Sequence, residues 1–568
     1  MPTGARISFG VYDETAKSDA SYSASSAQSW VNYSEIKNGL SPDEAPDEFE
    51  RYISGEPGVY RLDGSSRLFP SSTAGANLGY WSGVLSGSSG TFATSPVLSC
   101  AFSAPHTSVG ITIHFDATTH LTAFVVQWMS GSTVLDTVSV TGNNQQTVYV
   151  DNPVEDYTGL RIIPTSTDAP YRYVKIQEID FGRKVVYDNS TLVSASVIEE
   201  ADLSGGSAPA NSLRVTVLDP NNRLNPVNPD GVYAYLRKGM PLTVEFIRDG
   251  TAYPGGVYYL DTWEGSNTGT AKLTALDCLG LEKDYESRFY SSSAPLAVLA
   301  DVCASIGAGA EAGTLPVQAL KGYIPRVTVQ EAIAHICLAS GGYARVTREG
   351  NVWIGSITST PIVLQTGDVL GEPTVSKLEN PDTYEIETND YTVTGSGEMM
   401  GTNFIVRSGY PTTATMSNTV YYTNTSTGKA TLLADVIPEN LQNVYTAKGY
   451  ADRLEVTRPN KSGSCSYPYK PVTVADPVMI IDGGTSANKI RIDGIPLIIK
   501  ENYQITLNAL KSYYARTLKV KFRAAWKPGL DLGACVTAPT RFGSVTGNIS
   551  RMDIDLTGGL IATVEVIA

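Results

Sequence analysis

Alternation of apolar and polar residues dominates the chain, and it is clearest between residues 213 and 280. Leu213, Val215 and Val217 alternate with polar residues, which is the pattern of a half-buried strand. Turn residues follow Val217, where an Asn- and Pro-rich stretch excludes a helix. Three more alternating runs then follow, at residues 242–247, 257–263 and 271–276. We therefore predict a compact antiparallel β-unit in this part of the chain.

Helical spacing of apolar residues replaces the alternation after residue 290. The first helix is predicted over residues 295–306, with a proline in its first turn. Thr328 and Glu331 have the spacing of a capping box at the start of a second helix. A hairpin is expected to follow at residues 343–354. One more helix is predicted at residues 444–454, where apolar residues share a helical face.

Short strands at regular spacing predict a β-sandwich between residues 61 and 182. They are expected at residues 109–115, 122–128, 133–140, 147–150, 159–164 and 174–181. In the last strand, Val174 and Ile176 are out of phase with Ile179 and Phe181. A bulge near Gln177 would place all four on one face. Residues 1–60 hold one possible strand, and we expect an extended arm that orders against a neighbour.

The β-unit at residues 213–280 resembles the first barrel of phage tail hub proteins, the trimers that close the end of a tail tube. The residues that carry the resemblance are Asp219, Leu224, Asn225, Pro226, Asn228, Pro229, Gly231, Tyr233, Leu236, Gly239, Tyr259, Asp261, Trp263, Ala275, Asp277 and Leu279. The string from Thr328 to Ile354 is similar to the α/β piece between the hub barrels. Near the C-terminus, Leu532-Gly533-Ala534-Cys535-Val536 stands where the family usually has Leu-Gly-Asp-x-Val. This departure is expected to alter only a loop.

The segment before the hub-like part resembles a galactose-binding-like jelly roll, of the kind often fused ahead of hub domains. Its matching residues are 62–65, 79–82, 110–115 and 174–182. The fold class implied is mainly β with minor α and several domains. An N-terminal jelly-roll sandwich precedes hub-type β-barrels with small α/β insertions. The expected domains are 1–60 (arm), 61–182 (sandwich), 183–285 (first barrel), 286–372 (α/β subdomain) and 373–568 (second barrel region and C-terminal closure).

Composition narrows the possible functions. The 568 residues carry a formal net charge of −15, which disfavours nucleic-acid binding except through a local basic surface. The chain has no apolar run of about 18 residues, so no membrane span is expected. Its first residues lack a secretory pattern, and we expect synthesis in a cytoplasm. The six cysteines are scattered and are expected to be free, buried thiols: Cys100, Cys278, Cys303, Cys337, Cys465 and Cys535.

Candidate chemistry is sparse, and we predict a protein that is not an enzyme and has no cofactor or metal. His114 and His120 are interpreted as the solvated ends of a hairpin, although a metal site between them would be the alternative. A solvated or interfacial position is expected for His335. No nucleophile or phosphate-binding motif with the right context occurs. The carboxylate pairs Glu199-Glu200 and Asp553/Asp555 are expected to face solvent.

Aromatic residues of the sandwich could bind a partner. Tyr171 and Tyr173 are expected on one strand face beside Arg172, where they could contact a glycan or another protein. Trp81 and Trp128 are also candidates for stacking on sugars, but large aromatic residues of this kind more often fill the core.

The resemblance implies a homotrimer at the tail tip of a virion, assembled in the bacterial cytoplasm. Its role would be to close the tail tube, adapt its symmetry and open for DNA passage. Expected partners are the tail tube or distal tail protein, the tape-measure protein, tail fibre or other tip proteins, and host cell-wall glycan. The alternatives are a glycan-binding adhesin and a hexameric distal tail protein. A peptidoglycan-degrading hub is disfavoured, because the chain ends on a predicted strand at Ala568 without a further lytic domain.

Overall fold

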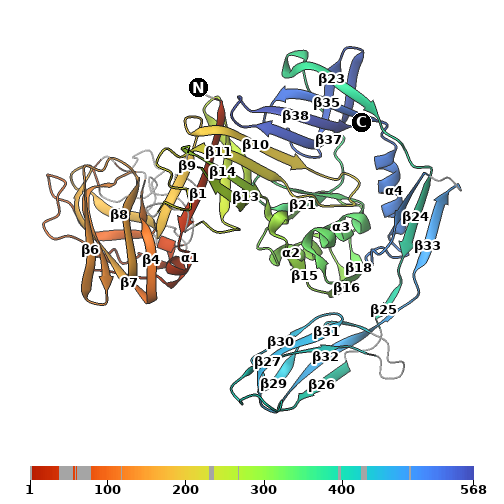
Figure 1. Ribbon diagram of the computed structural model, residues 1–568, viewed down its shortest axis with the longest axis horizontal. Helices are drawn as coiled ribbons and strands as arrows, with labels where there is room; N and C mark the ends of the chain where they lie inside the picture. The colour runs from red at the N-terminus through yellow and green to blue at the C-terminus, as the bar shows by residue number, and fades with distance from the viewer. Residues whose placement is uncertain are drawn as a thin grey trace. The chain divides into compact units, whose positions relative to one another are not determined.

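The computed structural model of the chain describes residues 3–37, 56, 57, 59, 78–116, 118–228, 236–266, 268–393, 398–423, 431–484 and 488–568. The protein is mainly β, with 54% strand and 10% helix, which confirms the predicted fold class. The chain divides into two compact units (Figure 1). The sandwich unit comprises residues 8–186 and 226–237, and the large unit comprises residues 1–7, 187–225 and 238–568.

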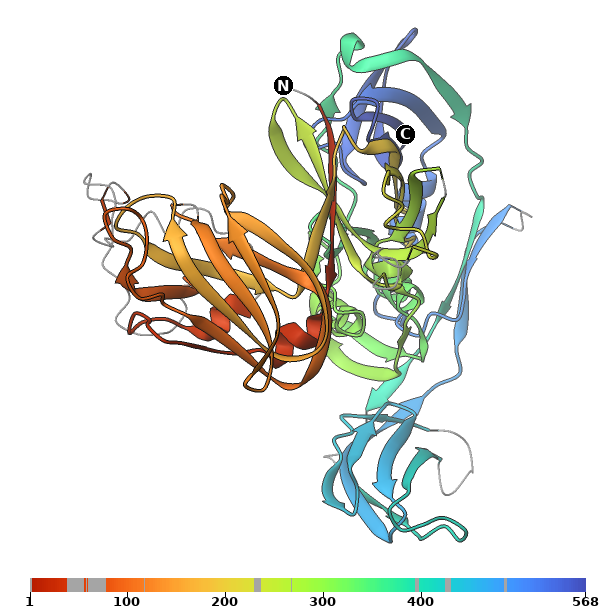
Figure 2. The same ribbon diagram turned by 60° about the vertical axis from the view of Figure 1, so that its left-hand side comes forward.

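The sandwich unit contains one sheet with the strand order β3-β8-β4-β7-β5-β6, and β2 pairs with β4. Figure 2 shows these strands in red to orange. Its strands are β2 (Ser21–Ala24), β3 (Tyr80–Leu85), β4 (Leu98–Phe115), β5 (Leu121–Ser130), β6 (Thr133–Thr141), β7 (Thr147–Thr167) and β8 (Tyr173–Asp180), followed by β9 (Gly182–Tyr187). The two strands predicted at residues 147–150 and 159–164 are the ends of the single long strand β7. The register between β4 and β7 shifts at three places, which bends these long strands.

The bulge predicted in the last sandwich strand is present. His114 pairs with Glu178 and Phe115 pairs with Ile176, so the register skips Gln177. All four apolar residues of that strand are at most 1% exposed: Val174, Ile176, Ile179 and Phe181. Trp81 and Trp128 also lie in this core, as expected.

Part of the predicted N-terminal arm belongs to the sandwich core of its own chain. Helix α1 (Glu14–Asp19) and the 3₁₀ helix η1 (Tyr33–Lys37) follow β1 (Gly4–Tyr12). The Asp13 side chain caps α1 by accepting hydrogen bonds from two backbone N–H groups. Ala16 and Ile36 are fully buried in the same hydrophobic cluster as the sandwich strands. The segment at residues 14–37 is therefore ordered by intramolecular packing.

A large open sheet forms the main part of the large unit, with the order β23-β35-β38-β37-β10-β11-β14-β13-β12-β1, and β36 pairs with both β37 and β22. The bounds are β10 (Leu192–Glu200), β11 (Ser212–Leu218), β12 (Pro241–Arg248), β13 (Thr251–Gly265), β14 (Thr270–Leu276), β22 (Ile362–Val363), β23 (Val369–Lys377), β35 (Leu518–Ala525), β36 (Cys535–Thr540), β37 (Gly543–Asp555) and β38 (Ile561–Ile567).

The expectation of two barrels needs correction for the residues that the structure describes, because no sheet there closes into a barrel. Strand β10 is the reason. It pairs with β11 of the first β-unit on one side and with β37 of the C-terminal strands on the other. The two sets of strands are therefore joined into one sheet.

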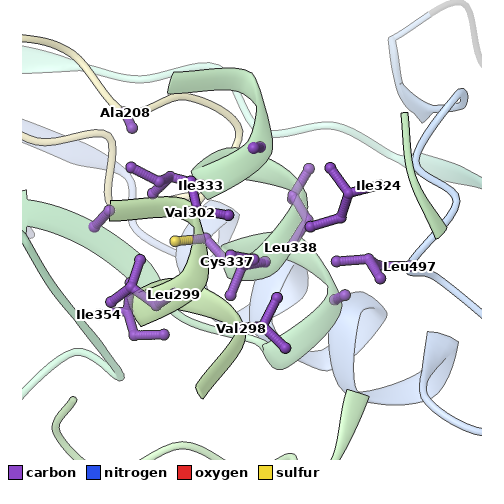
Figure 3. Close-up of a cluster of buried hydrophobic side chains, with 14 of the residues drawn as sticks. Ala208, Val298, Leu299, Val302, Ile324, Ile333, Cys337, Leu338, Ile354 and Leu497 are labelled. Atoms are coloured by element: carbon purple, nitrogen blue, oxygen red, sulfur yellow. The ribbon is translucent and has the colours of Figure 1, made fainter. Parts of the chain in front are cut away.

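An α/β subdomain packs beside this sheet. It contains β15 (Asp284–Tyr285), β16 (Arg288–Ser293), α2 (Pro295–Ala304), β17 (Ala310–Ala312), β18 (Leu320–Ile324), β19 (Val327–Thr328), α3 (Val329–Ser340), β20 (Tyr343–Val346) and β21 (Val352–Gly355). The predicted capping box at Thr328 and Glu331 is present, and the hairpin β20–β21 forms as expected. Figure 3 shows the buried cluster between the helices, with Val302, Ile333 and Cys337 at its centre. Helix α4 (Tyr503–Tyr514), which packs on α3, was not predicted.

Strands β24 (Thr383–Thr388), β33 (Val478–Gly483) and β34 (Lys489–Ile492) form a three-stranded ribbon in the order β33-β24-β34. A β-rich insert lies between β24 and β33 in the sequence. The insert strands are β25 (Tyr391–Val393), β26 (Glu398–Phe404), β27 (Thr415–Tyr421), β28 (Leu432–Ala434), β29 (Glu439–Gln442), β30 (Thr446–Gly449), β31 (Arg453–Pro459) and β32 (Gly463–Val474). The helix predicted at residues 444–454 is wrong. Strands β30 and β31 form an antiparallel hairpin there, because burying Leu454 and Val456 in the insert core favours the strand period.

Candidate functional site

Two buried aspartates shape the turns of the hub-like motif. The Asp219 carboxylate accepts hydrogen bonds from the backbone N–H groups of Arg223 (2.9 Å) and Leu224 (2.8 Å). Asp277 accepts from the N–H groups of Asn211 (2.9 Å) and Leu279 (3.0 Å). Burial raises the pKa of Asp277 to about 7, although these backbone hydrogen bonds lower it. Asp219 and Asp277 therefore have a structural role, because their carboxylates accept the backbone hydrogen bonds that hold these turns.

A β-bulge at Asp261 separates the aromatic residues of the motif. Tyr259 lies opposite Leu276, whereas after the bulge Trp263 lies opposite Leu273, a buried residue. Paired residues of antiparallel strands share a face of the sheet. The bulge therefore places Trp263 on the same side of the sheet as the buried Leu273, and Tyr259, Asp261 and Trp263 are all partly exposed.

Tyr259 and Asp261 line a groove of about 470 Å³ on the large unit. The Lys238 ammonium lies 2.8 Å from the Asp261 carboxylate at the side of this groove. The apolar part of the lining comes from β14, the following 3₁₀ helix and the turn after α2: Leu276, Leu281 and Ile306. An apolar floor beside one ion pair can hold a side chain of a protein partner, and this lining contains no nucleophile paired with a base.

Part of the motif loop lies within the described residues. Asn225 is buried, and Pro226 and Asn228 lie within the described residues. Pro229 and Gly231 lie outside them, so their place in the motif stays a prediction.

The predicted aromatic face of the sandwich needs correction. Tyr171 has a φ of 56° and precedes β8, so it does not share a strand face with Tyr173. Its ring is exposed, whereas Tyr173 packs against Trp81 with 6.1 Å between ring centroids. Arg172 lies between them in the sequence, and its Nε and Nη1 atoms are buried without a hydrogen-bond partner among the described residues. This leaves Tyr171 and Arg172 at one end of the sandwich as a candidate ligand contact.

The sandwich unit also contains a buried ion cluster that the sequence does not predict. The Lys175 ammonium is 2.7 Å from Glu56 and 3.3 Å from Asp116, and all three side chains are fully buried. It also lies 4.2 Å from the centroid of the Trp81 ring. Burial raises the pKa of Asp116, and Lys175 partly offsets this. No sequence motif indicates this cluster, because Lys175 lies inside strand β8 and its partners Glu56 and Asp116 are distant in the sequence.

The histidines differ from their predicted environments. His114 is buried, with Nε2 3.1 Å from the Asp180 carboxylate, so it is not a solvated hairpin end. His335 is also buried, and burial lowers its pKa. His106 holds helix α1, with its ring nitrogens 3.4 Å from Asp13 and 3.0 Å from Asp19. Within the described ranges, no three His, Cys, Asp or Glu residues are placed to bind a metal ion.

Arg348 connects β10 with the loop between β35 and β36. Its guanidinium binds Glu199 of β10 with two hydrogen bonds of 2.9 Å and also binds Asp531. It lies over the rings of Phe246 and Trp526, 5.3 and 5.2 Å from their centroids. Glu199 is therefore buried, contrary to its predicted solvent-facing position, because this arginine compensates its charge.

Other sequence-level expectations are met. Asp553 and Asp555 are exposed, and all six cysteines are buried free thiols. The longest described helices have 12 residues, and none of them could span a lipid bilayer.

No protein-family model and no curated protein matches the sequence. Among solved structures, the chain is similar to the 43 kDa tail protein of prophage MuSo2 from Shewanella oneidensis, with a TM-score of 0.37 and 10% identity over 67% of this chain and 95% of that one. It is similar to the prophage tail protein gp18 from Listeria monocytogenes EGD-e, with a TM-score of 0.33 and 8% identity over 68% and 91%. The third is a family 32 CBM of C. perfringens NanJ in complex with galactose, with a TM-score of 0.19 and 13% identity over 32% and 99%.

Proposed function

We propose that this chain is a structural phage tail protein, a homotrimeric hub that closes the end of the tail tube. It would adapt the symmetry of the tube and open for DNA passage. The observation that supports this best is the motif at residues 213–280. Its aspartates build a compact β-unit, and its Tyr259 and Asp261 line an open groove suited to a protein partner. The partners proposed are the tail tube or distal tail protein, the tape-measure protein and other tip proteins.

Sedimentation velocity of the purified full chain tests the proposal. A trimer of the 60.7 kDa chain, with a threefold ring in negative-stain images, is expected. A hexamer would favour a distal tail protein, and a stable monomer that does not assemble on tail tubes would contradict the hub. We also propose that the chain has no hydrolase activity. A zymogram on bacterial cell walls would contradict this if clearing followed the protein and disappeared on substitution of a single carboxylate.

A second candidate function is glycan binding by the sandwich unit. It is favoured by Tyr171, which is 46% exposed, and by the neighbouring, partly exposed Arg172. An aromatic ring can stack on a sugar while a guanidinium donates to its hydroxyls. We expect titration of the full chain with cell-wall saccharides to give binding that Tyr171→Ala and Arg172→Met both weaken. Tyr149→Phe, elsewhere on the sandwich, is the control. No binding across a broad panel would leave the sandwich as an adaptor.

A further inference from the structure

The far end of the insert displays apolar side chains. We call residues 405–410, 443–445 and 460–462 the insert tip. Strand β32 begins at the tip and ends where it pairs with β25 at the base of the insert, so its 12 residues separate the two by about 40 Å (Figure 1). The exposed fractions are 79% for Ile405, 55% for Tyr410 and 58% for Tyr445. A group of exposed apolar side chains in one loop region is typical of a surface that binds a partner.

The tip loop is held in place by buried polar groups. Asn460 is fully buried, donates to the carbonyls of Arg407 and Tyr410 (both 2.9 Å) and accepts from the Arg407 N–H (2.7 Å). The buried Arg458 donates to the carbonyl of Ile405 at 3.0 Å. The apolar side chains are therefore presented by a pre-organised loop, which lowers the entropic cost of binding a partner.

The charge of the insert is opposite to that of the rest of the chain. Residues 391–475 contain seven Lys or Arg against five Asp or Glu, although the whole chain has a net charge of −15. The sequence of the tip contains no acidic residue, and Arg407 and Lys461 are exposed there. The net negative charge therefore lies entirely outside the insert, and this favours a second copy of the same chain as the partner of the tip.

A hollow of about 240 Å³ elsewhere on the large unit has the complementary chemistry. Tyr253 contributes partly exposed aromatic surface, and Trp526, 2% exposed, lies at the floor. The charged groups of the lining are Glu311, Glu349, Asp531, Arg345 and Arg348, of which Arg348 is paired with Asp531. Both glutamates are exposed, and neither forms an ion pair with any residue that the structure describes. The volume is sufficient for one aromatic side chain.

We propose that the insert tip of one copy docks into this hollow on a second copy, with Tyr410 against the aromatic surface and Arg407 and Lys461 opposite the two glutamates. This inference rests on the proposed homotrimer. Different surfaces of the two copies meet, so the contact is head-to-tail. Three such contacts close a ring if each copy is rotated by one third of a turn.

Sedimentation of full-length variants tests the docking. The double substitution Ile405→Ser with Tyr410→Ala is expected to weaken association about tenfold or more, as for a central aromatic contact. Tyr421→Ala is the matched control, since Tyr421 is 66% exposed on β27 of the same insert but outside the tip. Circular dichroism checks that each variant keeps its strands.

Charge reversal makes the test independent of folding defects. Arg407→Glu with Lys461→Glu should weaken association, and so should Glu311→Lys with Glu349→Lys. If the two double variants were mixed, a ring of three copies would contain at least one contact between two copies of the same variant, where like charges repel. All four substitutions are therefore combined in one chain, which should associate again.

The possible failures are distinguishable. A wild-type trimer that the tip variants leave intact, or charge reversals that the combined variant does not rescue, would overturn the docking and leave the hub proposal standing. A wild-type dimer or hexamer that the tip variants dissociate would overturn the trimer and support the docking. A wild-type monomer at all concentrations would overturn both.

Discussion

Removing the charge of Arg348 should destabilise the large unit by far more than the loss of a surface ion pair. Its side chain is only 12% exposed and that of Glu199 only 6%, so water cannot replace the guanidinium. In Arg348→Met, Glu199 would be left as a buried charge without compensation. Removal of one partner from a buried pair costs about 3–5 kcal/mol, and lost contacts with Phe246 and Trp526 would add to this.

Two further variants separate charge from packing. Arg348→Met combined with Glu199→Gln removes both charges, and we expect it to recover more than half of the lost stability. Arg551→Met breaks a more exposed pair between β37 and Glu200 of β10 (2.8 Å), with side chains 37% and 46% exposed, and should cost about 0–1 kcal/mol.

The assay must follow the large unit alone, because a chain with two units need not unfold in one step. Urea unfolding with hydrogen exchange of peptides from β10 and β37 does this. A cost for Arg348→Met no larger than for Arg551→Met would refute the reasoning that Glu199 is buried and depends on this arginine.

Three other predictions follow from buried groups and caps. Lys175→Met should lower the melting temperature of the sandwich unit more than the same change combined with Asp116→Asn, because the single change leaves buried carboxylates without their counter-ion; calorimetry of the two variants decides this. The pKa of Asp277 is raised in the folded state to about 7, so its contribution to stability is fully present below the unfolded pKa near 3.8 and is lost as pH rises toward 7. The urea midpoint of unfolding should therefore fall less between pH 4 and 7 in Asp277→Asn than in the native chain. A fragment of residues 8–186 should melt well above one of residues 61–186, which lacks buried core residues such as Ile36; equal melting temperatures would mean that the N-terminal segment adds no stability.

The sequence was informative where local chemistry decides the structure. The capping box at Thr328, the bulge near Gln177 and the alternation of Leu213 to Val217 depend on neighbouring residues, and each is present. The helix predicted at residues 444–454 failed because apolar spacing over so few residues fits two periods, and the insert core selected the strand.

The candidate sites were only partly predictable for a related reason. The motif residues around the groove were named from sequence, but the bulge that orients Tyr259 was not. The ion clusters around Arg348 and Lys175 join residues more than 50 positions apart, and His114 became buried through Asp180, 66 positions away. Spacing along the chain carries no signal for such contacts.

The position of β10 between β11 and β37 has a consequence for synthesis of the protein. The residues of β10 leave the ribosome about 350 residues before those of β37, so one edge of β10 has no partner until the chain is almost complete. Pairing over so large a separation is slow, and an unpaired edge is a template for aggregation. Ribosomes that stop early would therefore release chains with an adhesive edge. We expect nascent chains of this protein to depend on a chaperone that covers β10 until translation ends.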